Sequence, residues 1–187
     1  MGSLEAAEKS LAVTHAGRGL FRMAEALAMR IGVIAIGKLK SGGERVLVDR
    51  YLERLRGAKA VGVTAVQEKE LPESRAAKAA ERCADEAQRI LKAAGDADVL
   101  VALDERGRTM TSDAFASWLQ QVRDRGSQHI VFAIGGPDGH GDDVIAHATL
   151  SLAFGKMTMP HGLARAVLAE QIYRATTILA GHPYHRA

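Results

Sequence analysis

The sequence predicts an α/β protein with a mostly parallel sheet and helices on both faces. Three observations lead to this class. Short apolar runs rich in β-branched residues alternate with longer segments of helical periodicity. The apolar runs lack polar alternation, which is typical of strands buried on both faces. Glycines follow several of the helical patterns, where a helix would end.

The first half of the chain predicts three strands and two helices. The strands are the apolar runs at 31–36, 59–66 and 98–103. A helix over 43–56 carries Val48, Leu52 and Leu55 on one face and ends before Gly57. A second helix over 72–94 begins with proline and ends before glycine, which suits both positions.

The second half predicts two strands and three helices. Thr111 or Ser112 caps a helix that stops at Gly126, because a hydroxyl can accept a bond from a free N–H of the first turn. The remaining elements are strands at 130–134 and 150–154 and helices over 142–148 and 161–180.

Length and composition favour one globular domain. The 187 residues are 47% hydrophobic and 25% charged, as in folded domains. We expect residues 1–28 to be an extension outside the core, with Met29 as the natural start, and residues 29–187 to form the domain. Because Cys83 is the single cysteine, no disulfide can form within the chain, which fits a reducing compartment. No apolar run is long enough for a transmembrane helix, so we expect a cytoplasmic protein without a membrane partner.

Charge permits an RNA partner without requiring one. The formal net charge is +3 and the pI is about 9.2. From residue 156 onward, four cations (Lys156, Arg165, Arg174 and Arg186) stand against one anion, Glu170. A phosphate-bearing partner would therefore be attracted to the C-terminal part.

Parallel sheets bind ligands where their strands end, which singles out the loops after residues 103, 134 and 154. In the run Gly135–Gly139, glycines permit close approach of a ligand to the backbone, although an ordinary turn explains them equally well. The loop over 155–160 offers backbone groups and the polarizable side chains of Met157 and Met159, whose alternative role is core packing.

The C-terminal helix and tail offer candidate RNA contacts. Arg165 and Arg174 lie on the helix, where the alternative is a solvated face with a Glu170–Arg174 pair. An aromatic ring and several cations in the tail suit single-stranded RNA; they are His182, Tyr184, His185 and Arg186. The alternative is an anchor whose tyrosine packs on the core. Two histidines without Cys or acidic partners do not predict a metal site.

Several segments together resemble one family. They are Leu103-Asp-Glu-Arg-Gly107, Ile134-Gly-Gly-Pro-Asp-Gly139, Leu150-Ser-Leu152, Lys156-Met-Thr-Met-Pro-His-Gly-Leu-Ala-Arg165, Glu170-Gln-Ile-Tyr-Arg174 and His182-Pro-Tyr-His185. In this order they resemble the ribosomal RNA large subunit methyltransferase H family, the pseudouridine N3-methyltransferases of the SPOUT superfamily. The resemblance runs from about Met29 to the C-terminus.

The resemblance implies a C-terminal trefoil knot, an exception to the rule that chains are unknotted. It also implies S-adenosylmethionine as cofactor and a homodimer whose sites are completed by the partner chain. The implied substrate is a pseudouridine in the intersubunit stem-loop of 23S ribosomal RNA on assembled ribosomes. Rival hypotheses are a knotted methyltransferase of another RNA, such as tRNA, and a non-catalytic ribosome assembly factor.

Matched residue by residue, the resemblance implies a cofactor site at Leu103, Gly135, Phe154, Gly155, Lys156, Met157, Thr158 and Met159. His161, Arg165, Tyr184, His185 and Arg186 match positions on the RNA side. His140 and Gly141 depart from the family pattern, which has an apolar residue and a small polar one there. Methylation of a ring nitrogen requires loss of its proton, and we nominate His161 or Asp104 as the base.

Overall fold

A computed structural model describes residues 28–186, with side chains through Tyr184. Residues 1–27, most of the expected extension, lie outside the described residues. The strands are β1 (Met29–Ile36), β2 (Val63–Leu71), β3 (Val99–Thr109), β4 (His129–Ile134) and β5 (Leu150–Ala153). The α-helices are α2 (Gly43–Arg56), α3 (Ala79–Ala94), α4 (Ser112–Asp124), α5 (Asp142–His147) and α6 (His161–Leu179). Two 3₁₀ turns are η1 (Lys59–Val61) and η2 (Pro183–Arg186).

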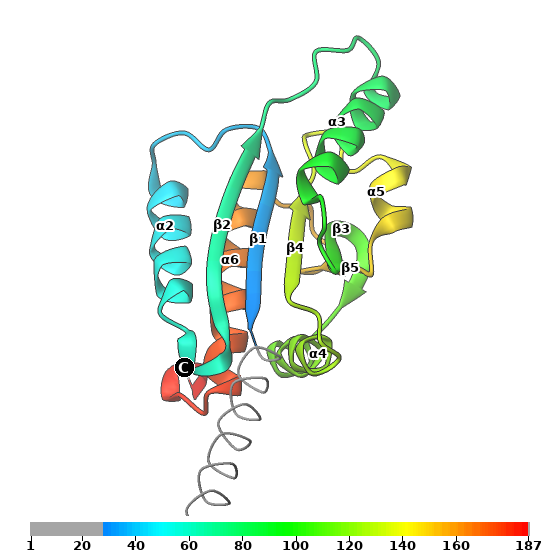
Figure 1. The fold of residues 1–187 in the computed structure, drawn as a ribbon. Helices are drawn as coiled ribbons and strands as arrows, with labels where there is room; N and C mark the ends of the chain where they lie inside the picture. The colour runs from blue at the N-terminus through cyan, green and yellow to red at the C-terminus, as the bar shows by residue number, and fades with distance from the viewer. Residues whose placement is uncertain (1–27, 187) are drawn as a thin grey trace, which may run out of the picture.

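The strands form one parallel sheet in the order β2-β1-β4-β3-β5. Two hydrophobic clusters lie on opposite faces of this sheet. Helices α2, α4 and α6 contribute to one cluster, and α3 and α5 to the other (Figure 1). The predicted α/β class, with a parallel sheet covered on both faces, is confirmed. The trefoil knot stays a prediction.

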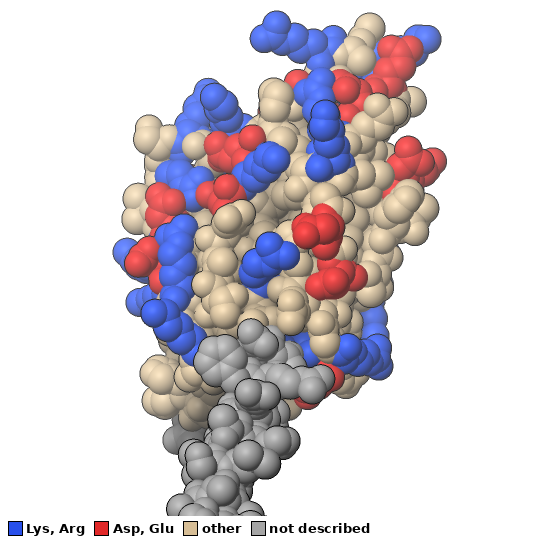
Figure 2. All heavy atoms as spheres, viewed as in Figure 1, with Lys and Arg blue, Asp and Glu red and all other residues tan. Residues whose placement is uncertain are grey.

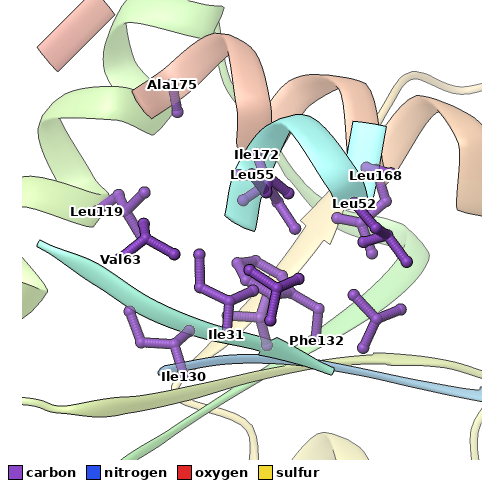
Figure 3. Close-up of a cluster of buried hydrophobic side chains, with 14 of the residues drawn as sticks. Ile31, Leu52, Leu55, Val63, Leu119, Ile130, Phe132, Leu168, Ile172 and Ala175 are labelled. Carbon is purple, nitrogen blue, oxygen red and sulfur yellow. The ribbon is translucent and has the colours of Figure 1, made fainter. Parts of the chain in front are cut away.

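The larger cluster joins the middle of the sheet to α6. Ile31 and Phe132 point from adjacent strands toward Leu168 and Ile172 of α6, with Leu52 and others from α2 between them (Figure 3). All these side chains are at most 3% exposed. Burial of a large aliphatic or aromatic side chain stabilises the fold by about 1.5–3 kcal/mol. These contacts anchor α6 to the sheet.

The first half of the chain corrects two predictions. The expected strand over 59–66 is instead the turn η1 followed by β2, which extends to Leu71 beside β1. Glu68 and Glu70 obscured this strand, because charged residues are uncommon in a sheet; here they pair with Arg45 and Arg165.

The predicted helix over 72–94 was too long, since α3 begins only at Ala79. The preceding segment is held as a loop by Ser74. Its N–H donates to Glu86 and its hydroxyl to Asp85, at 2.8 and 2.6 Å. A serine that binds the following helix in this way competes with helical backbone bonds. The other helices match their predicted positions within two residues, and the Thr111 hydroxyl caps α4 by accepting a bond from the N–H of Ala114.

Among the described helices, none combines the length and apolar character needed to cross a bilayer. Within the same range of residues, no cluster of three or more His, Cys, Asp or Glu side chains is arranged to hold a metal ion.

Candidate active site

The segments after β4 and β5 meet the second half of β3 at the carboxyl edge of the sheet and line a cavity of about 910 Å³. The loop expected after residue 103 is instead a continuation of β3 to Thr109, with an irregularity in its pairing to β5 after Leu103. Strand β3 supplies residues 103–106, the turn after β4 supplies 134–140, and the end of β5 with its loop supplies 152–155 and 157–160. The cavity also reaches His161 and Ala164 at the start of α6. Its volume suits a cofactor of nucleoside size, since such pockets measure roughly 300–1,000 Å³.

The predicted cofactor residues converge on this cavity, with one exception. Seven line it: Leu103, Gly135, Phe154, Gly155, Met157, Thr158 and Met159. Lys156 lies outside the lining and is exposed. Met157 is 86% exposed, which excludes the alternative that it packs in the core of this chain. The Thr158 hydroxyl donates to Glu105 at 3.2 Å, which ties the loop to the end of β3.

The glycine turn after β4 is closely packed. A Cβ on Gly135 would lie 2.7 Å from the carbonyl oxygen of Gly139, within the same turn. A Cβ on Gly136 would lie 2.7 Å from a carboxylate oxygen of Glu86. Arg82 of α3 also holds the turn through Asp138, at 2.7 Å. These contacts leave the backbone of the turn facing the cavity and explain why glycine is required there.

The two nominated bases, Asp104 and His161, both line the cavity. Asp104 accepts three bonds from Arg106, one of them from the backbone N–H. The Arg106 guanidinium holds the pKa of Asp104 below its usual value, despite opposition from burial. An aspartate so stabilised in its charged form is a weak proton acceptor, so the geometry favours an orienting role for Asp104.

His140 is a site residue whose position the sequence did not reveal. His140 lines the cavity and is 9% exposed, and its ring interacts with the backbone carbonyls of Leu103 and Ala133. Burial lowers the pKa of His140, although the Asp104 carboxylate opposes the shift. The imidazole is therefore neutral in the folded protein near pH 7. The sequence showed only that a histidine at position 140 departs from the family pattern, and it did not place this residue in the site.

Replacement of His140 by leucine should make folding less sensitive to acid. The folded pKa lies below the unfolded value of about 6.5. As pH falls below about 6.5, the unfolded state takes up a proton that the folded state does not, so stability declines. We expect His140→Leu to reduce this decline between about pH 7 and 5 in denaturant titrations. An unchanged pH dependence would show that other groups cause it.

Among the RNA candidates, Arg174, His182 and Tyr184 lie away from the cavity. Helix α6 starts at the cavity with His161 and has 19 residues, so it ends about 28 Å away at 1.5 Å per residue. The chain terminus lies at the opposite end of the sheet from the strand tips (Figure 1). There the Tyr184 hydroxyl donates to Glu170 at 3.2 Å, and Arg174 stacks over the Tyr184 ring. His182 is exposed nearby. The side chains of His185 and Arg186 lie outside the part of the chain that the structure describes.

Arg165 is not an exposed cation in this structure, and its direct contact with RNA stays a prediction. The side chain is 1% exposed. Its guanidinium donates to Glu70 at 2.7 Å and to the carbonyl oxygens of Ile36 and Gly37 at 3.0 and 2.6 Å. Sequence patterns missed this because Arg165 and its partners are about 95–129 positions apart in the chain.

Comparison with known proteins agrees with this architecture. Residues 29–185 match the family model described as "Predicted SPOUT methyltransferase". A "Ribosomal RNA large subunit methyltransferase H" from Bradyrhizobium diazoefficiens is 51% identical over 160 residues, covering 85% of this chain and all of that protein. The protein of the same name from Brucella anthropi is 48% identical with the same coverage.

A solved structure, the Aquifex aeolicus TrmH/SpoU tRNA modifying enzyme, aligns over 88% of this chain and 85% of its own. Its TM-score is 0.40 and its identity 14%. The fold, the cavity and the family match together define the class: the chain belongs to the SPOUT methyltransferase family. Its nearly full-length relatives at 48–51% identity are the large-subunit ribosomal RNA methyltransferases just described.

Proposed function

We propose that the protein methylates N3 of a pseudouridine in the intersubunit stem-loop of 23S ribosomal RNA, with S-adenosylmethionine as methyl donor. The observation that carries the reaction is the cavity at the carboxyl edge, lined by seven of the eight expected cofactor residues. The substrate follows from the relatives' name and their identity along their whole length. Because ribosomes are its substrate, we place the enzyme in the cytoplasm.

The cavity suits this cofactor. The closely packed turn at Gly135 presents backbone rather than side chains, and Met157, Met159 and Phe154 add apolar contact for a flat base. S-adenosylmethionine supplies a methyl group already activated on a sulfonium. The protein's task is thus to orient the target nitrogen and accept its proton. His161 is the candidate acceptor, and Asp104 orients neighbouring groups while it remains charged.

The active enzyme is a homodimer in this proposal. The cavity and the predicted RNA contacts Arg174, His182 and Tyr184 lie at opposite ends of α6, so one chain does not bring them together. A partner that packs in the opposite direction would bring its tail to the cavity. Val46, Leu47 and Leu163 are 56%, 37% and 43% exposed, on the first turns of α2 and α6, and form an apolar surface for such a partner.

Mixed dimers test the shared site. A Gly135→Val chain should lack cofactor but keep its tail, whereas a chain without residues 184–187 should bind cofactor but lack the tail. Each alone should be inactive. After mixing and subunit exchange, random pairing should restore about a quarter of wild-type methylation, because half the dimers hold one complete site. A mixture as inactive as its components would argue that each chain builds its own site.

The reaction itself is tested by transfer of labelled methyl from S-adenosylmethionine to bacterial ribosomes that lack the modification. A parallel sample carries uridine in place of the target pseudouridines. Label that maps to the pseudouridine loop and drops with uridine supports the proposal. Cofactor binding without transfer to either ribosome would indicate another RNA substrate, such as tRNA, and no cofactor binding would favour the assembly factor.

A further inference from the structure

The loop between β1 and α2, residues 37–42, lies against the first turn of α6 at the edge of the cavity. A Cβ on Gly37 would lie 3.1 Å from Cε1 of His161. A Cβ on Gly162 would lie 3.2 Å from Cδ1 of Leu39. Gly37 also has a φ of +84°, a conformation that side chains rarely adopt. The loop is therefore seated directly beside His161, which lines the cavity.

A partly buried ionic network, with Arg165 at its buried end, holds this loop in place. Arg165 donates to the carbonyl oxygens of Ile36 and Gly37, where the loop begins. Its partner Glu70 accepts a further bond from the N–H of Leu39, at 2.8 Å. We call Arg165, Glu70, Glu68 and Arg45 the brace; Arg45 completes it with contacts to Glu68 at 2.6 Å and Glu70 at 3.7 Å. Such a network is costly to bury, and its best-supported use is to specify one conformation.

The brace supports two exposed cations. Lys38 and Lys40 flank the half-buried Leu39, and neither forms a salt bridge with any described residue. The loop itself contains no acidic residue; Glu73 lies against Gly37 and Glu44 against Gly162. On the face shown in Figure 2, Lys and Arg side chains lie at the upper edge, where the strands end, and also along the side and the lower part, interspersed with acidic groups. Lysines fixed beside a nucleotide-modifying cavity suit the phosphates that flank a target base.

We propose that Lys38 and Lys40 bind the RNA backbone beside the target nucleotide, and that Arg165, through the brace, is the positioning residue that fixes their loop. This inference rests on the proposed RNA methylation. It replaces the expected direct contact of Arg165 with an indirect one. The loop orients the substrate, whereas the turn at Gly135 and the loop at 154–159 hold the cofactor.

The first experiment removes the charges. Full-length Lys38→Ala/Lys40→Ala should raise the KM for unmodified ribosomes roughly tenfold and flatten its dependence on salt, because fewer phosphate contacts release fewer counterions. The Kd for S-adenosylmethionine should not change. Lys38→Arg/Lys40→Arg should retain most of the affinity. The control, Lys92→Ala, removes an exposed charge on α3, which packs on the face of the sheet opposite to α6, and should behave as wild type.

The second experiment tests the brace. Arg165→Lys keeps the charge beside Glu70 but cannot span the carboxylate and both carbonyl oxygens. We expect a raised KM for ribosomes with little change in cofactor Kd. When Arg165→Lys is added to Lys38→Ala/Lys40→Ala, KM should rise no further, since the lysines that the brace positions are already absent. A purely structural role would instead give additive losses in both KM and cofactor binding.

Three outcomes would overturn the inference. An unchanged KM and salt dependence in Lys38→Ala/Lys40→Ala would show that the loop does not bind RNA. Conversion of that variant to a monomer would show that the lysines serve the dimer. If Arg165→Lys raised KM by the same factor in Lys38→Ala/Lys40→Ala as in the wild type, the brace would not act through the two lysines. Failure of the proposed function looks different, because the wild-type protein would then not methylate ribosomes.

Discussion

Gly135→Val should strongly weaken cofactor binding. The first atom of the new side chain would lie 2.7 Å from the carbonyl oxygen of Gly139, so the turn must open and its backbone must leave the cavity wall. Overpacking of this kind costs about 1–3 kcal/mol, which corresponds to a roughly 5- to 150-fold weaker Kd if it falls on the bound state. Calorimetric titration with S-adenosylmethionine measures this change.

Gly43→Val is the matched control for that experiment. Gly43 starts α2, and a Cβ there would meet no atom within 4 Å. The same side chain added at this position should leave cofactor affinity and the unfolding midpoint close to wild type. Normal cofactor affinity in Gly135→Val would remove the turn from the site, and loss of the folded circular dichroism spectrum would show that its role is structural.

Deletion of residues 184–187 should reduce methylation of ribosomes by roughly 100-fold or more, because misplacement of a reacting group by about 1 Å has effects of that size. Tyr184, the residue of this segment whose side chain the structure describes, does not line the cavity, so cofactor Kd should stay within a few-fold of wild type. Filter-binding of labelled ribosomes and calorimetry with S-adenosylmethionine separate the two effects.

In the structure Tyr184 also packs against neighbouring side chains. The deletion therefore needs a control that separates loss of this packing from loss of RNA binding. The Tyr184 ring packs against Tyr173 at a centroid distance of 5.0 Å, and its hydroxyl lies 3.3 Å from that of Tyr51. Burial raises the pKa of Tyr184, so its phenol remains a donor at neutral pH. Tyr184→Phe keeps the ring and removes the hydroxyl, and should retain stability. Equal loss of methylation and cofactor binding in the deletion would make the tail a structural anchor only.

Much of the architecture was predictable because local patterns carry it. Continuous apolar runs located β1, β3, β4 and β5, and glycine and hydroxyl signals bounded α2 and α4 within two residues. In a parallel sheet the carboxyl ends of the strands meet at one edge, so loops after three strands could be expected to converge. The resemblance to the family named eight cofactor residues, and seven of them line one cavity in the structure.

The predictions that failed concern residues whose interaction partners are not adjacent in the sequence. The charged end of β2 is a strand because Arg45 and Arg165 neutralise Glu68 and Glu70, and no local period reveals such pairing. The segment before α3 is a loop because Ser74 binds Asp85 and Glu86. Arg165 resembled a surface cation by residue type alone, although the fold buries it against the end of β1.

By itself, the sequence determined the α/β class, the order of the elements, most of the segments that line the cavity, and the family. These follow from apolar periodicity, from turn residues and from motifs that are local in the chain. Only the tertiary structure decided which ionisable groups are exposed, which are buried and paired, and how far the tail lies from the cavity. The reason is physical: burial and ion pairing depend on distances between elements, and the chain sets those distances only when it packs.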